Sequence, residues 1–266
     1  LLPCSPAPLL PRNPATPPPS PASQDHPMDP FTNRHIILTG GTGALGSAAP
    51  SWFLERGGIC HVPWVHEKDL DRFPHRTHER VHLYANVELT DEPAVERFYA
   101  AVALHGPLWA SIHIAGGFSY APIETVTKAA FVAQMQQNAL TCFLCCREAV
   151  KLMLASKGGG RIVNVAARPA LEPRTGANMV PYTASKAAVA AITQALAEEV
   201  IAKDPHILIN AVVPSIMDTP ANRQSMPTAD HAKWPKVDHV AATIAFLASP
   251  ENTATRGGLI PVYGAA

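Results

Sequence analysis

Tyr182 and Lys186 form a pair that suggests proton-transfer chemistry. Four residues apart, they share one face of a helix, and the alanine-rich run from Ala184 to Ala197 favours a helix here. A free phenol titrates near pH ~10, and a close ammonium lowers its pKa by favouring the phenolate. Such a phenol can give or take a proton near neutral pH. An isolated Tyr-x-x-x-Lys pair more often marks an ordinary amphipathic helix. Whether this pair is catalytic therefore depends on the other elements of the chain.

A glycine-rich turn near the start of the chain has the context of a dinucleotide-binding site. A β-rich run at 35–39 leads into Gly40-Gly41-Thr42-Gly43-Ala44-Leu45-Gly46, and a helical stretch follows to about Arg56. Glycines let the backbone approach a pyrophosphate, and the helix N-terminus supplies free N–H groups. The turn therefore predicts a phosphate site. Pro50 lies inside the helix and predicts a distortion, since interior proline costs about 3 kcal/mol.

Strand-like and helical segments alternate along the rest of the chain. Further strands are expected near 59–62, 81–85, 111–115, 161–166, 207–213 and 259–262, with helices near 92–104, 128–156 and from 180 onward. This alternation predicts a single-domain α/β fold, a Rossmann-type doubly wound parallel sheet of about seven strands with helices on both faces. Residues 31–266 would form this domain. Residues 1–30 are dominated by Pro, Ser and Ala and are expected to be a disordered leader.

The composition argues against several other classes of protein. The 266 residues are 47% hydrophobic and carry a formal net charge of zero, which is enough for one α/β core and gives no basic footprint for nucleic acid. No apolar run approaches the roughly 18 residues that span a bilayer. We therefore expect a small-molecule substrate, no nucleic-acid or membrane partner, and a cytoplasmic location.

The cysteine and histidine patterns do not predict a metal site. Cys142, Cys145 and Cys146 fall in one helical segment, where they are expected as small buried residues at a helix contact. No further ligands at matching spacing accompany them. The dense histidines between His61 and His82 are not joined by an H-x-x-x-H pattern on a helix and are expected to be mostly solvated.

The cofactor preference stays open. In a dinucleotide-binding fold, an acidic residue about 20 positions past the glycines holds the adenosine ribose. Here the second strand runs into Pro63-Trp64-Val65-His66, with Lys68 and Arg72 following. The missing acid favours NADP(H) over NAD(H), and both remain candidates.

The ordered motifs resemble the short-chain dehydrogenase/reductase family over nearly all of residues 34–266. The matching pieces are Thr39-Gly40…Gly43…Gly46, Ala115-Gly116-Gly117, Asn138, Tyr182-x-x-x-Lys186, Asn210…Pro214…Thr219-Pro220 and the tail Leu247-Ala248-Ser249…Gly257-Gly258. The resemblance implies that Tyr182 donates the proton, that Lys186 binds the nicotinamide ribose and lowers the tyrosine pKa, and that Asn138 holds a water. It also implies cofactor contacts from Gly40, Thr42, Gly43, Ala44, Leu45, Gly46, Asn86, Val87, Ala115, Gly116, Gly117, Lys186, Pro214, Ile216 and Thr219.

Within the family, the segment from Asp218 to Trp234 looks like quinonoid dihydropteridine reductases, as do Ala115-Gly116-Gly117-Phe118 and the strand end at 166–171. The family's catalytic serine usually lies at that strand end, where this chain has Ala166 and Ala167. Dihydropteridine reductases also lack this serine, and their polarised quinonoid substrate accepts hydride readily. Thr175 is an alternative source of a hydroxyl.

These patterns lead to one main hypothesis and two alternatives. The main hypothesis is an NAD(P)H-dependent oxidoreductase acting on a small polarised acceptor such as a quinonoid dihydropterin, with a mobile lid from Ser215 to about Trp234. The alternatives are a carbonyl reductase of the 3-oxoacyl or sugar type and a non-catalytic dinucleotide-binding protein. The resemblance also implies a homodimer or homotetramer through the long helices, whose small residues Cys142, Cys145, Ala188 and Ala191 would allow close approach.

Overall fold

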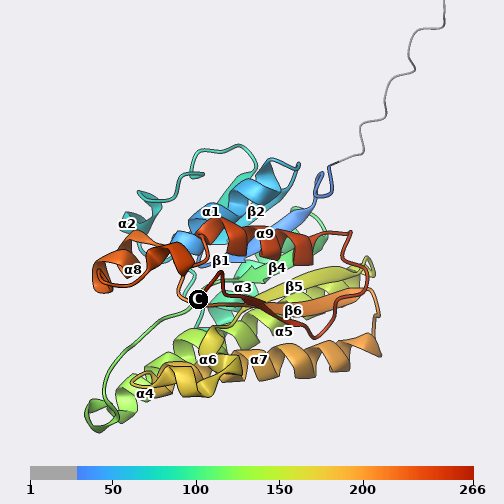
Figure 1. The fold of residues 1–266 in the computed structure, drawn as a ribbon. Coiled ribbons are helices and arrows are strands. Elements are labelled where there is room, and N and C mark those ends of the chain that lie inside the picture. Colours follow the sequence, from blue (N-terminus) through green and yellow to red (C-terminus); the bar gives the residue numbers. More distant parts are fainter. Residues whose placement is uncertain (1–28) are drawn as a thin grey trace, which may run out of the picture.

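The computed structural model describes residues 29–266, so the expected leader lies outside the described residues except for positions 29 and 30. Seven strands form one parallel sheet in the order β3-β2-β1-β4-β5-β6-β7 (Figure 1). They are β1 His35–Thr39, β2 Ile59–Pro63, β3 Val81–Tyr84, β4 Leu108–His113, β5 Gly160–Val165, β6 Ile207–Pro214 and β7 Leu259–Val262. The chain winds outward from β1 in one direction and then in the other, which confirms the predicted doubly wound fold.

Helices cover both faces of this sheet (Figure 1). The α-helices are α1 Ala44–Leu54, α2 Glu67–Leu70, α3 Glu92–Ala103, α4 Lys128–Gln134, α5 Thr141–Ser156, α6 Arg168–Leu171, α7 Val180–Ile201, α8 Pro220–Ser225 and α9 Val237–Ala248. Short 3-10 turns are η1 Ile123–Thr125, η3 Pro173–Gly176 and η4 His231–Lys233, and η2 Met135–Leu140 is a π-helix. Among residues 29–266, no helix has both the length and the apolar character needed to cross a membrane.

The alternation of side chains along β1 explains the two layers of helices. Ile36 and Leu38 pack into a core with α1 and α9, whereas Ile37 points to the other face and packs with α3, α5 and α7. Successive side chains of a strand point to opposite faces. A central parallel strand buried on both faces therefore needs the continuous apolar run that this sequence supplies.

Two helices differ from their sequence predictions. The helix expected over 128–156 is three segments, because the π-helix η2 separates α4 from α5. The distortion expected at Pro50 does not break α1, which stays one helix from Ala44 to Leu54. Pro50 is buried within that helix, and α1 packs along α9, so tertiary packing offsets the lost backbone N–H.

Four histidines, His35, His61, His82 and His105, form a cluster on β1, β2, β3 and the loop after α3. The burial of His61 contradicts the expectation that the histidines between His61 and His82 are mostly solvated. His61 is fully buried, its Nε2 lies 2.9 Å from Nδ1 of His35, and its Nδ1 lies 2.8 Å from the Tyr84 hydroxyl. The ring of His82 stacks on that of His61 with ring centres 5.0 Å apart, and the ring of His105 lies tilted against His82 with ring centres 4.5 Å apart. Burial, reinforced by the neighbouring imidazoles, lowers the pKa of His61 to about 3.

We expect this cluster to make the protein less stable in mild acid. Because the folded-state pKa of His61 lies below its ordinary value, the unfolded chain takes up a proton that the folded chain refuses as the pH falls through 6.5. The free energy of unfolding should fall by about 1.4 kcal/mol per pH unit for one such proton. Urea unfolding at pH 7.5, 6.0 and 5.0 measures this slope. His61→Gln, which retains a hydrogen-bonding side chain, should flatten it, and an unchanged slope would contradict the assignment.

Candidate active site

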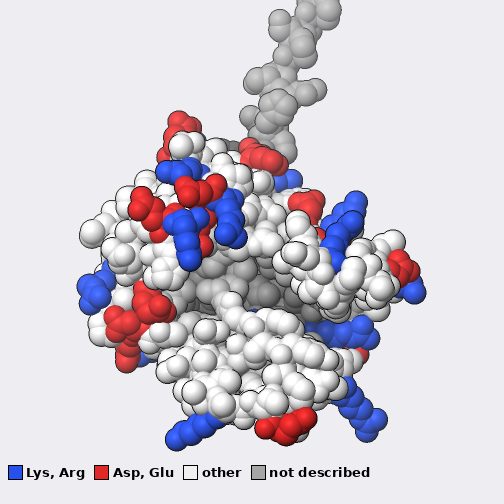
Figure 2. All heavy atoms as spheres, turned by 90° about the vertical axis from the view of Figure 1, so that its left-hand side faces the viewer, with Lys and Arg blue, Asp and Glu red and all other residues white. Residues whose placement is uncertain are grey.

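The predicted site residues meet at the carboxyl ends of the central strands. Tyr182 and Lys186 lie in the first turns of α7, and Asn138 lies in η2. The glycine turn follows β1, and Gly116 follows β4. Figure 2 looks onto the left-hand side of Figure 1, where the molecule is hollowed between two lobes. In an open parallel sheet, ligands bind in the crevice outside the carboxyl ends of the strands.

Lys186 is anchored to the sheet at the carboxyl end of β5. The side chain is buried, and its Nζ donates a 2.7 Å hydrogen bond to the carbonyl of Val165, the last residue of β5. Desolvation lowers the pKa of Lys186 to about 8. Burial thus removes part of the water around the ammonium, and the hydrogen bond to the Val165 carbonyl fixes its position.

Tyr182 has a raised pKa, which differs from the sequence expectation. The side chain is half-buried, and desolvation raises its pKa to about 12. Burial is the cause of this shift, and the lowering expected from Lys186 does not appear in it. A phenol with this pKa carries its proton at neutral pH, which is the state that a proton donor requires.

Asn138 ties the loop after β4 to the start of α7. Its Oδ1 accepts a 3.1 Å hydrogen bond from the N–H of Gly117, and its Nδ2 donates to the Gly117 carbonyl and to Ser185 Oγ, both at 3.0 Å. Ser185 Oγ in turn donates to the carbonyl of Tyr182 at 2.7 Å. Asn138 therefore positions backbone around the tyrosine, while its carbonyl oxygen keeps a second lone pair for a water. The π-helical turn that presents it is a feature often found at functional sites.

The glycine turn has the shape of a phosphate cradle. Gly40 has φ of +68°, and a Cβ there would lie 2.6 Å from the backbone nitrogen of Ala115. A Cβ on Gly46 would lie 2.0 Å from the carbonyl oxygen of Gly40. Gly43 and Ala44 are exposed where α1 begins, and the first turn of α1 carries no acidic residue. This turn fits a diphosphate through backbone N–H groups and the positive end of the helix dipole.

The remaining residues predicted around the turn divide into exposed and buried positions. Thr42 is half-buried, whereas Leu45 is buried in the core and offers only backbone to a ligand. Asn86 is exposed just after β3 with φ of +57°. Val87 is buried, and its N–H donates to the carbonyl of Trp64. Of these four side chains, Asn86 is the one that reaches solvent freely at the sheet edge.

The segment predicted as a lid begins after β6. Pro214 ends that strand and is buried, whereas Ile216 is 45% exposed. The hydroxyl of Thr219 accepts from the N–H of Asn222 and so caps α8, which leaves it less free for a cofactor than predicted. A backbone hydrogen bond from the N–H of Asp218 to the carbonyl of Pro235 joins the two ends of the segment.

The strand end after β5 lacks a hydroxyl. Ala166 and Ala167 are both buried there. The alternative Thr175 is exposed, and its hydroxyl donates to the carbonyl of Glu172 within η3. Sequence reasoning did not assign a role to Phe118, which is 63% exposed and packs edge-to-face on Tyr182 with ring centres 5.0 Å apart. The signal for it was an aromatic residue directly after the glycines of the β4 loop.

Known proteins with similar sequences include several dehydrogenases. The family model described as short chain dehydrogenase matches residues 34–230. Cis-4-hydroxycyclohexanecarboxylate dehydrogenase from Sinomonas cyclohexanicum is 30% identical over 246 residues, which cover 88% of this chain and 96% of that protein. The 7alpha-hydroxysteroid dehydrogenase of Bacteroides fragilis is 27% identical and covers 89% and 95%.

Solved structures share the fold. Levodione reductase superposes with a TM-score of 0.78 at 24% identity, covering 88% of this chain and 97% of that one. ElxO with NADP bound gives a TM-score of 0.79 at 22% identity, covering 88% and 98%.

Proposed function

The chain belongs to the short-chain dehydrogenase family and is an oxidoreductase, and from this premise we propose that it reduces a small polarised acceptor, first of all a quinonoid dihydropterin. The observation that carries the proposal is the pair Ala166 and Ala167 at the end of β5, next to an intact Tyr182 and Lys186. Without a hydroxyl there to polarise a carbonyl, the acceptor must itself be electrophilic.

The other steps of the proposed reaction are assigned to the cofactor and to individual site residues. A bound NAD(P)H supplies the hydride. The N-terminus of α1 would hold the diphosphate of this cofactor, and Lys186 would bind its nicotinamide ribose. Tyr182 gives its hydroxyl proton to the reduced substrate, and the Lys186 ammonium stabilises the phenolate that remains. A hydride and a proton together reduce one C=N bond of a quinonoid ring.

Phe118 supports a planar substrate. Its exposed ring stands edge-to-face to Tyr182 and gives the recess a flat apolar wall beside the proton donor. Aromatic rings pack favourably against other rings in stacked or edge-to-face geometry. A bicyclic pterin could lie on this wall with its reacting edge toward the tyrosine hydroxyl.

The proposal is tested by following oxidation of NADPH and NADH with quinonoid dihydropterin and with a panel of ketones. Turnover of the pterin supports it. Turnover of ketones alone would favour a carbonyl reductase of the 3-oxoacyl or sugar type, and cofactor binding without any turnover would favour a non-catalytic binding protein. The variant Ala167→Ser adds the missing hydroxyl. A large gain on ketones with little change on the pterin would show that this position sets the substrate class.

We further propose a preference for NADP(H). The second strand ends at Pro63 without an acid at that end to bind the ribose hydroxyls, and Lys68 is exposed in the short helix α2 that follows, between Glu67 and Asp69. An acidic residue at the strand end would repel a 2′-phosphate, whereas a lysine attracts it. The ratio of kcat/KM for NADPH over NADH in the same assay decides between them.

We also propose a homodimer through the faces of α4, α5 and α7, with a correction to the residues involved. Cys142 and Cys145, expected at that contact, are buried inside the subunit. Ala191, also expected there, is exposed. Larger apolar side chains lie beside it: Phe143 is 47% exposed and borders a groove between α5 and α7 that Ile192 and Leu196 also line, with charged side chains such as Arg147 at its sides. An exposed apolar patch of this kind favours a partner surface.

Phe143→Glu is expected to convert the dimer into a monomer, because it removes an apolar ring from the contact and puts a carboxylate there at a desolvation cost. Light scattering after size-exclusion chromatography measures the mass. Leu104→Glu is the matched control, since Leu104 is 89% exposed at the end of α3, away from the groove. A wild type that runs as a monomer at all concentrations would refute the dimer.

A further inference from the structure

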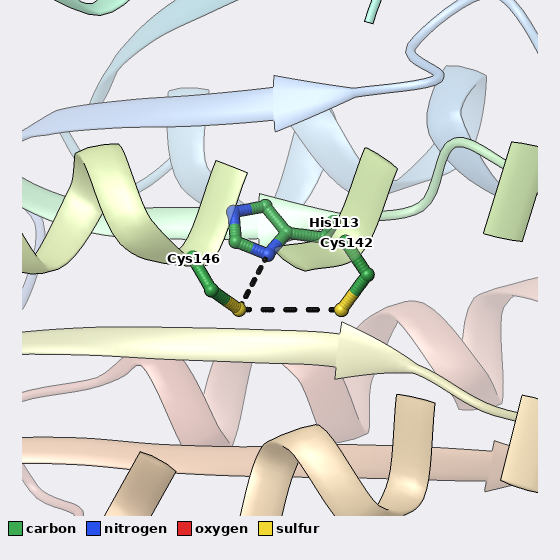
Figure 3. Close-up of side chains that lie close together, drawn as sticks. All are labelled: His113, Cys142 and Cys146. Carbon is green, nitrogen blue, oxygen red and sulfur yellow. Dashed lines mark hydrogen bonds between the residues drawn. The ribbon is translucent and has the colours of Figure 1, made fainter. Parts of the chain in front are cut away.

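A buried polar cluster behind the active site contains two thiols and an imidazole. His113 at the end of β4 meets Cys142 and Cys146 of α5, and all three are at most 5% exposed (Figure 3). The two sulfur atoms lie 4.0 Å apart, and Cys146 Sγ lies 3.5 Å from His113 Nδ1. The three donor atoms all lie within 4.8 Å of one another.

We propose that His113, Cys142 and Cys146 bind a thiophilic d10 metal ion, Zn²⁺ in the first instance. A metal–sulfur bond of about 2.3 Å and a metal–nitrogen bond of about 2.05 Å place two sulfurs about 3.8 Å apart in a tetrahedral site, and sulfur and nitrogen about 3.6 Å apart. The separations of 4.0 and 3.5 Å lie within about 0.2 Å of these values, and Cys142 Sγ, which lies within 4.8 Å of His113 Nδ1, reaches its value by a side-chain shift of at most about 1.2 Å. Thiolate and imidazole are the ligands that Zn²⁺ and Cu⁺ prefer.

The surroundings of the cluster match a metal site in two further ways. Asn164 Oδ1 lies 3.4 Å from Cys146 Sγ and 2.8 Å from His113 Nδ1, where it can serve as a fourth donor. The other imidazole nitrogen, Nε2, lies 2.8 Å from Ser111 Oγ and 3.3 Å from the Tyr99 hydroxyl. A ligating histidine commonly donates its second N–H to such an oxygen, which fixes the ring and its tautomer.

The charges and protons balance for Zn²⁺. Two thiolates neutralise the divalent ion, so the buried site carries no net charge. Binding releases the two thiol protons to solvent, while His113 moves its proton from Nδ1 to Nε2 and turns Nδ1 to the metal. Cys146 also lines the groove between α5 and α7, which offers the ion a short path from solvent.

The test titrates the full chain, stripped of metal with a chelator and kept reduced, with Zn²⁺ against a chromophoric competitor and with Co²⁺ as a spectroscopic probe. We expect one equivalent bound and, for Co²⁺, a thiolate-to-metal charge-transfer band. Cys142→Ser and Cys146→Ser should each weaken binding at least tenfold. Cys145→Ser is the matched control, because Cys145 is buried on the same helix outside the cluster, and it should bind as the wild type does. A parallel titration with Cu⁺ shows which d10 ion is held more tightly.

Three results would overturn the proposal: no binding by the wild type, equal loss in Cys145→Ser, or binding that survives both cluster variants without a charge-transfer band. The last would place the ion on surface imidazoles such as His82 and His105. A second measurement needs no variant. In mild denaturant, Zn²⁺ should slow maleimide labelling of Cys142 and Cys146 but leave labelling of Cys60 unchanged, as peptide mapping would show.

Discussion

Tyr182→Phe is expected to lower reductase turnover by about 100- to 10,000-fold, the contribution typical of a positioned general acid. The change removes only the hydroxyl. The phenylalanine ring would keep the edge-to-face contact with Phe118 and the place of residue 182 in α7. Cofactor affinity and thermal stability should therefore change little, because the glycine turn and Lys186 are untouched.

Initial rates with the best acceptor and a fluorescence titration of NADPH separate these two effects. The control is Tyr120→Phe, because Tyr120 is an exposed tyrosine whose hydroxyl accepts from Asn178 in a loop contact outside the proton path. Full turnover by Tyr182→Phe would refute the assigned proton donor. Loss of cofactor affinity in step with turnover would instead mean that the tyrosine has a structural role.

The parts of the site that the sequence predicted are those in which the signal is local. The apolar run of β1 and the glycine turn after it are adjacent in the chain, and Gly40 is required by its own φ and by close contact with Ala115. The spacing of Tyr182 and Lys186 likewise follows from one helix. Each of these inferences depends on a few consecutive residues and a known period.

The electrostatics of the site could not be predicted in this way. The pKa of Tyr182 is raised because distant segments of the chain fold over it, and Lys186 is bonded to Val165, 21 positions away. Burial, and therefore the sign of a pKa shift, belongs to the tertiary structure.

Clusters that form across strands are hidden for the same reason. The parallel register of β2 and β3 places His61 opposite His82, which turns residues 21 positions apart into direct neighbours. His113 meets Cys146 because β4 packs under α5. Spacing within one element does not reveal such pairs, which is why the sequence alone indicates no third ligand for the cysteines.

Ala44→Glu is expected to weaken binding of the dinucleotide by at least tenfold, or about 1.4 kcal/mol, without destabilising the fold. Ala44 is the exposed first residue of α1, at the helix end where the diphosphate is proposed to bind. A carboxylate there repels the phosphates. The same carboxylate suits the helix itself, since acidic residues in the first turn interact favourably with the helix dipole. Ligand affinity and stability should therefore change in opposite directions, which a general folding defect cannot produce.

Calorimetric titration with NADPH and thermal unfolding of the free protein measure both quantities on the same samples. Ala44→Gln is the matched variant, because it adds nearly the same volume without the charge. If repulsion dominates, the glutamate variant should bind far more weakly than the glutamine variant, and added salt should narrow the difference by screening. Equal losses of NADPH affinity in the two variants would mean that the size of the side chain, and not its charge, weakens binding. Unchanged affinity in both would place the diphosphate away from the N-terminus of α1 and refute the proposed cofactor site.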